Sequence, residues 1–178
     1  MKLEGLHHGT AITGDAQRNV DSYAGTLGLR MVKKTVNQDE PSVYHLFYAD
    51  ENGSAGSDIT FFEFRGAGDG RAGDGMVHRV DWRVASSEAL DFWEARLADA
   101  GGSPVRTDGG LDFTDPEGLA QRIVISDVSD PALVAEHPDV KPEHALRGFD
   151  GVRAYGSNPE ASRPLIEDAL GFSAVAGE

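Results

Sequence analysis

Two adjacent histidines, His7 and His8, lie in the segment LHHGT near the start of the chain. Imidazole nitrogen is a common ligand of divalent metal ions, so the pair is a candidate metal-binding feature. The segment HHGTAIT alternates as a β-strand does, and neighbouring residues of a strand point to opposite faces. We therefore expect at most one of the two rings to serve a given site. By itself, the doublet is better explained by two solvated or hydrogen-bonded histidines.

Other reactive groups are limited by the composition. The chain contains no cysteine, which excludes disulfides, thiolate nucleophiles and cysteine metal sites. The glycine-rich segment GAGDGRAGDG lacks the Lys-Ser/Thr pair and the following helix that a phosphate-binding loop requires. We interpret this segment as a connection between two units.

The chain of 178 residues is strongly acidic, with 16 Lys and Arg against 30 Asp and Glu and a formal net charge of −14. Acidic residues are spread along the whole sequence, which favours a halophilic surface over a charged interaction tail; an ordinary acidic cytosolic protein is the alternative. Such a surface repels nucleic acid and anionic lipid, so neither is expected as a partner. No apolar run could span a bilayer and no signal-peptide pattern is present, so a cytoplasmic location is expected.

A pattern of one strand, one helix and three strands occurs twice and begins a third time. The third start imitates the first, because RGFDGVRAYGSNPEASRPLIEDALGF matches EGLHHGTAITGDAQRNVDSYAGTLGL. The repeat predicts a first βαβββ unit, a glycine-rich connection, a second βαβββ unit, a linker and an incomplete third unit. Their expected bounds are residues 1–65, 66–75, 76–126, 127–146 and 147–178.

The repeat predicts an α+β fold in which paired βαβββ modules form one curved mixed sheet with both helices on the convex face. Asp15 is the expected N-cap of the first helix and Gly28 its end, and the second helix is expected within SSEALDFWEARLADAGG. The concave face is then the natural place for a ligand. Apolar residues at helical spacing are expected to be buried: Val20, Tyr23, Leu27, Leu90, Trp93 and Leu97.

The segment GDAQRNVDSYAGTLGLRMVKKTVN, together with LDFWEARL and FTDPEGL, resembles the ring-cleaving (extradiol) dioxygenases of the glyoxalase/bleomycin resistance/dioxygenase (vicinal oxygen chelate) superfamily. The resemblance covers nearly the whole chain and is strongest over residues 5–64. It implies non-haem iron(II) bound by two histidines and one glutamate, and cleavage of a catechol- or hydroquinone-like aromatic. Such proteins carry four units, so this chain resembles an N-terminal half plus the start of the third unit.

The resemblance places metal ligands on the first and last strands of a unit, facing the concave side. Counted back from the strand-to-helix turn, His8 corresponds to Arg79 and lies on the concave face, whereas His7 lies with the helix-side residues. The glutamate position is occupied by Arg122 in the second unit and by Thr60 in the first. Guanidinium cannot bind a metal ion. His8 is therefore the one metal ligand that the resemblance assigns, and the chain alone is not expected to hold iron tightly.

Further residues are candidates for the lining of the pocket. Glu63 is one strand position away from the ligand register and is expected at a sheet edge or in a salt bridge. His78 would become a ligand only if the register slipped, and His137 and His144 are expected at the surface. The expected pocket residues are His45, Thr60, Phe62, Arg79 and Arg122.

Two functions are consistent with these residues. The first is the iron-dependent dioxygenase with a small aromatic substrate, for which the sequence assigns no catalytic side chain. The second is a metal-free module of the same superfamily that binds an aromatic ligand. In the first case the remaining histidine and glutamate would belong to a fourth unit that this chain does not contain. The expected partner is that missing C-terminal half or a second chain in a homodimer.

Overall fold

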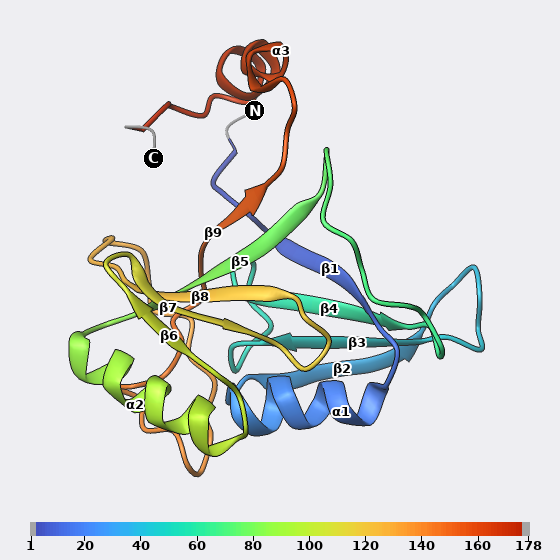
Figure 1. The fold of residues 1–178 in the computed structure, drawn as a ribbon. Helices are drawn as coiled ribbons and strands as arrows, with labels where there is room; N and C mark the ends of the chain where they lie inside the picture. Colours follow the sequence, from blue (N-terminus) through green and yellow to red (C-terminus); the bar gives the residue numbers. More distant parts are fainter. Residues whose placement is uncertain (1–2, 176–178) are drawn as a thin grey trace.

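The computed structural model describes residues 3–175, and the repeat is visible in the order of its elements (Figure 1). The first unit contains one strand, a helix that continues as a π-helical stretch, and three strands. Its elements are β1 (His8–Thr13), α1 (Ala16–Val20), η1 (Asp21–Thr26), β2 (Arg30–Val36), β3 (Tyr44–Ala49) and β4 (Asp58–Glu63).

The second unit has the same order, and the third begins in the same way. The second comprises β5 (Val77–Val84), α2 (Ser87–Asp99), β6 (Val105–Thr107), β7 (Gly110–Thr114) and β8 (Ala120–Ile125). The third comprises β9 (Phe149–Ala154), α3 (Pro159–Arg163) and η2 (Pro164–Ala169). The α+β class and the paired βαβββ organisation are thus confirmed.

The strands form two hydrogen-bonded sheets instead of the single sheet that we expected. The first has the order β1-β4-β3-β2 and the second the order β6-β7-β8-β5-β9. In each unit the first strand runs parallel to the last, as β1 does to β4 and β5 to β8. The difference arises because β9 pairs antiparallel with β5 and so occupies the edge that a continuous sheet would need. The third unit's first strand therefore finds its partner within the chain.

The first helix begins at its predicted cap, and the second begins within the predicted segment. The Asp15 side chain accepts hydrogen bonds from the backbone N–H groups of Gln17 and Arg18, and Ser86 accepts one from Ala89. Gly28 follows the first helix with φ of +68°, a conformation that favours glycine. Both helices lie on the same side of the strands in Figure 1, which leaves the opposite face of each sheet without a helix.

The core lies between the helices and the sheets. Five of the six predicted helix residues are buried; the sixth, Val20, is partly buried against the same core. The predicted linker also contributes, because Val140, Ala145 and Leu146 are buried in this core. By contrast, α3 and η2 have no buried residue and stand apart from the rest of the chain (Figure 1). Among the described residues, no helix is long and apolar enough to cross a bilayer.

Candidate functional site

His8 lies on the helix-free face of the first sheet. Along β1 the exposed residues His8, Thr10 and Ile12 alternate with the more buried Gly9, Ala11 and Thr13. Ala11 packs against the core, so the exposed set must point away from the helix. This is the orientation that the sequence predicted for His8.

The neighbouring strand continues this face in register. In the parallel pair of β1 and β4, His8 lies opposite Asp58 and Thr10 opposite Thr60. The Thr60 hydroxyl donates to the Thr10 hydroxyl over 3.1 Å and lies 3.0 Å from Nε2 of His45 on β3. Polar atoms from three strands are therefore connected beside His8, with the Thr60 side chain itself buried.

An aromatic cluster borders this polar row. The His45 ring stacks on Phe62, with 3.9 Å between ring centroids, and lies 4.0 Å from the Phe47 ring. Burial lowers the pKa of His45, and the positive charges of Lys33 and His8 lower it further. A neutral imidazole can both donate and accept hydrogen bonds, which suits its contact with a hydroxyl group. The cluster places apolar ring surface beside hydrogen-bonding groups.

The arrangement of the two adjacent histidines differs from our expectation. His7 is exposed and precedes β1, and its Nδ1 atom lies 3.2 Å from Nδ1 of His8. The expectation that strand alternation separates the two rings is wrong, because the strand begins only at His8. The His7 carbonyl accepts a hydrogen bond from the Gly56 N–H over 2.8 Å, which fixes the backbone just before the strand.

Asp58 is a candidate that sequence reasoning missed. Its Oδ1 atom is buried and has no hydrogen-bond partner among the described residues. Burial raises the pKa of this carboxyl group, while the nearby His8 and His7 lower it. The signal in the sequence was weak: only the pairing register of β1 and β4 places this acidic residue opposite His8.

The described residues do not form a complete metal site. Over residues 3–175 there is no group of three His, Asp or Glu side chains that could hold a metal ion. An iron site of the family type needs three protein ligands on one face. Of these, the described part of the chain offers His8, so no reaction step through a metal is derived from this structure.

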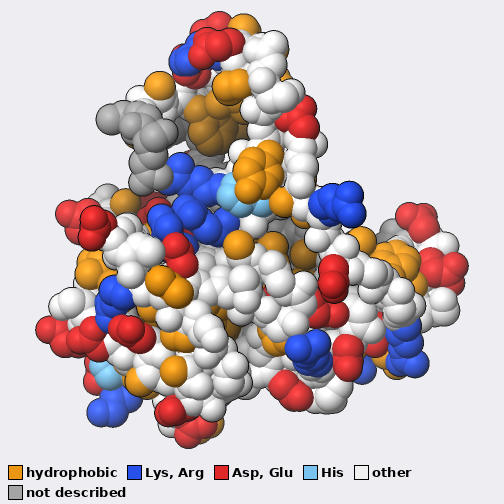
Figure 2. Space-filling model, in the orientation of Figure 1, with side chains coloured by type: hydrophobic (Ala, Val, Ile, Leu, Met, Phe, Trp, Pro, Cys, Tyr) orange, Lys and Arg blue, Asp and Glu red, His pale blue; other side chains and the backbone are white. Residues whose placement is uncertain are grey.

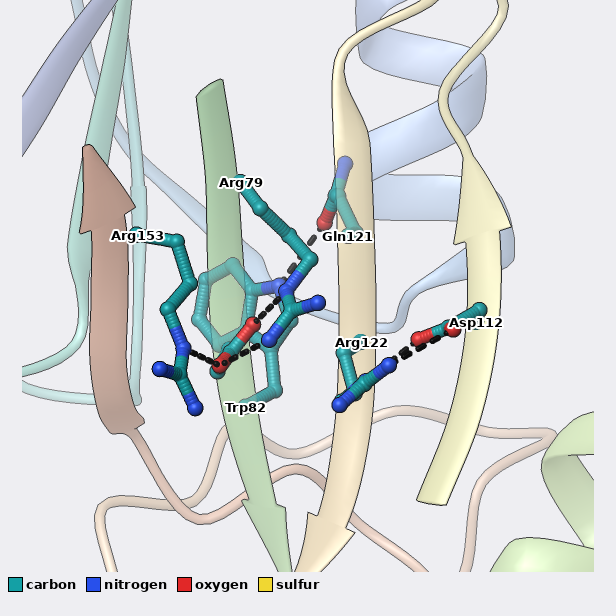
Figure 3. Close-up of polar contacts among 7 residues, drawn as sticks. Arg79, Trp82, Asp112, Gln121, Arg122 and Arg153 are labelled. Carbon is teal, nitrogen blue, oxygen red and sulfur yellow. Dashed lines mark hydrogen bonds and ion pairs between the residues drawn. The ribbon is translucent and has the colours of Figure 1, made fainter. Parts of the chain in front are cut away.

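The second sheet holds arginines at the corresponding positions. Arg79 donates from Nε and Nη2 to the two carboxylate oxygens of Asp81, at 2.7 and 3.1 Å, and Arg122 forms a two-point pair with Asp112 (Figure 3). Both arginines were expected to line the pocket with His45, Thr60 and Phe62. The structure joins those three residues on the first sheet and places the two arginines on the second.

The remaining candidates have structural contacts. Glu63 is buried, accepts a hydrogen bond from the Ala16 N–H and pairs with Arg65 at 3.3 Å, which confirms the expected salt bridge. The His78 ring stacks on Tyr155 with 3.9 Å between centroids. His144 was expected at the surface, but it is only partly exposed and its Nδ1 atom is buried.

Most of the first two units matches a known protein family. Residues 5–122 match the model of the Glyoxalase/Bleomycin resistance protein/Dioxygenase superfamily. The chain is 39% identical over 183 residues to the "Putative ring-cleaving dioxygenase MhqE" of Bacillus subtilis, covering 100% of this chain and 59% of that protein. It is 38% identical to the chlorohydroquinone/hydroquinone 1,2-dioxygenase of Sphingobium indicum over 83% of this chain and 48% of that protein.

Solved structures agree with the fold. The crystal structure of a "putative dioxygenase" from Bacillus subtilis superimposes with a TM-score of 0.91 at 39% identity, over 99% of this chain and 58% of that one. A glyoxylase/bleomycin resistance protein/dioxygenase domain from Frankia matches with a TM-score of 0.58 at 20% identity, which supports the fold alone. The chain thus spans less than two thirds of its curated relatives. It belongs to the glyoxalase/bleomycin resistance protein/dioxygenase superfamily.

Proposed function

We propose that this chain is part of a ring-cleaving dioxygenase that acts on a catechol- or hydroquinone-like aromatic, with His8 as one metal ligand and iron(II) as the metal. The observation that carries the proposal is the position of His8 on the helix-free face, in register with a polar and aromatic surface. The names of the longer relatives support the reaction class. A cytoplasmic location in a salt-rich cell is part of the proposal and rests on the acidic composition.

The side chains beside His8 suit an aromatic diol. Phe47 and Phe62 offer apolar ring surface, and aromatic rings pack on such surfaces in offset or edge-on geometries. Thr10 and His45 offer a hydroxyl and an imidazole group that can hydrogen-bond a phenolic hydroxyl, and the buried Thr60 hydroxyl contacts both of them. When bound, iron(II) would hold the diol and dioxygen at adjacent open positions. The role of these residues is to orient the ring with respect to that position.

The remaining ligands are proposed to come from another unit that pairs with β1. The edge of β1 away from β4 has no strand partner among the described residues. The pair of β5 and β9 shows that the first strands of two units can join antiparallel. A C-terminal half, or the partner chain of a homodimer, could add a first strand to β1 in the same way. The longer relatives favour the C-terminal half.

Anaerobic titration of the chain with ferrous iron tests the role of His8. We expect weak binding that His8→Ala abolishes, because one imidazole cannot supply a stable site. His78→Ala is the matched control, since His78 is a partly exposed strand histidine of the second sheet, and it should leave binding unchanged. His7→Ala should retain binding, because His7 lies before the strand. Tight stoichiometric binding, or weak binding that survives His8→Ala, would contradict the proposal.

A metal-free aromatic-binding module is the second candidate function. The ring contacts of His45, which stacks on Phe62 and lies 4.0 Å from the Phe47 ring, favour it. Calorimetric titration with hydroquinone in the presence and absence of EDTA separates the two functions. Hydroquinone binding that is equal in both conditions supports the metal-free module. Binding that requires added ferrous iron supports the dioxygenase.

A further inference from the structure

Lys33 on β2 lies on the helix-free face of the first sheet, in a cross-strand row with residues beside His8. The register pairs Lys33 with Phe47, and Phe47 with Thr60. Thr60 in turn pairs with Thr10 on β1. Residues directly opposite one another on paired strands share a face of the sheet, so the four side chains form one row. The row runs from a hydroxyl group on β1, across an aromatic ring on β3, to an ammonium group on β2.

The ammonium group of Lys33 turns toward the middle of this face. Its Nζ atom lies 5.7 Å from the centroid of the Phe47 ring on β3. Its positive charge also reaches the neighbouring His45, because it contributes to the lowered pKa of that imidazole. Lys33 therefore places its charge beside the aromatic cluster and not at the outer edge of β2.

Lys33 has no negatively charged partner on this face. It is exposed, and no carboxylate among residues 3–175 forms an ion pair with it. Arg30 at the start of the same strand, by contrast, pairs with Glu51. The β2 end of the row thus offers an unpaired positive charge to a ligand.

This local charge is opposite in sign to that of the chain as a whole. The formal net charge is −14, and Asp and Glu side chains are spread over the face of the molecule shown in Figure 2. Such a general field repels anions. Selection of an anionic ligand must therefore come from direct contact with a nearby cation, within the short range that salt leaves unscreened.

We propose that Lys33 is a specificity-determining residue that binds the carboxylate of an aromatic diol, so that the substrates are diols whose ring also carries a carboxylate. The inference rests on the proposed function and names its substrate class. The ring lies along Phe47 and Phe62, with the diol toward His8 on β1. In the strand order β1-β4-β3-β2, the Phe47 ring that Lys33 approaches is two strand spacings, about 10 Å, from β1. A benzene ring with a polar group at each end, together with its hydrogen bonds, can bridge that separation.

Calorimetric titration of the full chain with protocatechuate and with its methyl ester tests this assignment. Both probes have the same ring and diol, but only protocatechuate carries a negative charge at neutral pH. The titrations are carried out anaerobically with ferrous iron and repeated with EDTA, so that ring binding is measured whether or not it needs a metal. We expect protocatechuate to bind about three- to fivefold more tightly than the ester at low ionic strength, as for an exposed ion pair. Sodium chloride should reduce this preference.

Two adjacent lysines provide a matched pair of variants. Lys33→Met removes the charge but keeps an apolar side chain beside Phe47, so it should abolish the preference for protocatechuate and leave the affinity for the ester unchanged. Lys34→Met changes the net charge by the same amount, but Lys34 pairs with the buried Leu46 and its Nζ lies 4.1 Å from the Tyr44 ring on the helix side. It should keep the preference. Lys33→Arg should also keep it, because the positive charge remains.

The outcomes separate this inference from the proposed function. Equal binding of the two probes to the native chain overturns the role of Lys33 and leaves the proposed function in place. Binding of neither probe in either condition overturns both. Equal loss of preference in Lys33→Met and Lys34→Met assigns the preference to net charge and contradicts a local contact. Weaker binding of the ester to a folded Lys33→Met, checked by circular dichroism, shows a general role in the surface and also overturns the assignment.

Discussion

Replacing Tyr23 by phenylalanine removes the centre of a buried polar network that joins the two units. The Tyr23 hydroxyl donates to Oδ2 of Asp115 over 3.0 Å and accepts from Nε2 of Gln121 over 2.7 Å. Oε1 of Gln121 in turn accepts from the Trp82 indole over 2.7 Å. All four side chains are buried. Burial raises the pKa of Tyr23, and so does the Asp115 charge, so the hydroxyl keeps its proton.

The loss in free energy of unfolding can be estimated from the buried polar groups that Tyr23→Phe leaves without a hydrogen-bond partner. Phenylalanine keeps the ring contacts with Tyr48 and Phe61 but leaves a carboxylate oxygen of Asp115 and an amide donor of Gln121 unsatisfied. Each unsatisfied buried group costs about 1–3 kcal/mol. Because Asp115 Oδ1 keeps its bonds to two backbone N–H groups, we expect a total loss of about 3 kcal/mol.

Urea denaturation of Tyr23→Phe measures this free energy from the midpoint and slope of the transition. Tyr155→Phe is the matched control, because Tyr155 is 48% exposed and keeps its stack on His78 as phenylalanine. The control should change the free energy of unfolding by less than about 0.5 kcal/mol. If both variants lose the same free energy, the network does not stabilise the junction between the units.

Three further predictions concern the backbone, acid stability and salt. Gly148→Ala should destabilise the chain by about 2 kcal/mol in urea denaturation, because φ is +92° and a Cβ atom would lie 2.8 Å from the Gly56 carbonyl oxygen. Gly68→Ala, with open space at the Cβ position, should be neutral. The hydrogen bond from Arg122 lowers the pKa of Asp112, so this pair stabilises the fold above the unfolded pKa of Asp112 and is lost as pH falls through the lower folded value. Asp112→Asn should therefore flatten the acid limb of a plot of Tm against pH, and an unchanged limb would exclude this pair as its cause. Finally, Tm should rise between low and molar sodium chloride, because screening relieves repulsion in a chain of net charge −14; a flat or falling Tm would contradict a halophilic surface.

Much of the fold could be predicted because the repeat constrains it. The caps Asp15 and Ser86 lie at the same distance from His8 and Arg79, so the two units could be aligned residue by residue. Alternation along β1 then sufficed to place His8 on the helix-free face. The repeat requires a strand where β6 lies, but its position could not be assigned, because its three exposed residues carry no alternating pattern.

The parts that could not be predicted depend on pairing between distant segments. Nothing in the local pattern of β9 indicates that it pairs with β5 and so divides the strands into two sheets. The approach of Asp58 to His8 follows from the register of β1 and β4, which is a tertiary property. The burial of Leu146 in a proline-containing linker likewise depends on packing against both units.

The central claim is that His8 binds a metal ion on the helix-free face of the first sheet. Nuclear magnetic resonance of the six imidazole side chains during titration with Mn²⁺ tests it directly, because a bound paramagnetic ion broadens the nearest signals first. We predict that the His8 signals broaden at the lowest Mn²⁺ concentration and that His78 and His137 stay sharp. In His8→Ala, the signals of the neighbouring His7 and His45 should also stay sharp at that concentration. Broadening that begins at any of the second-sheet or linker histidines, or that leaves His8 unchanged, would contradict the claim.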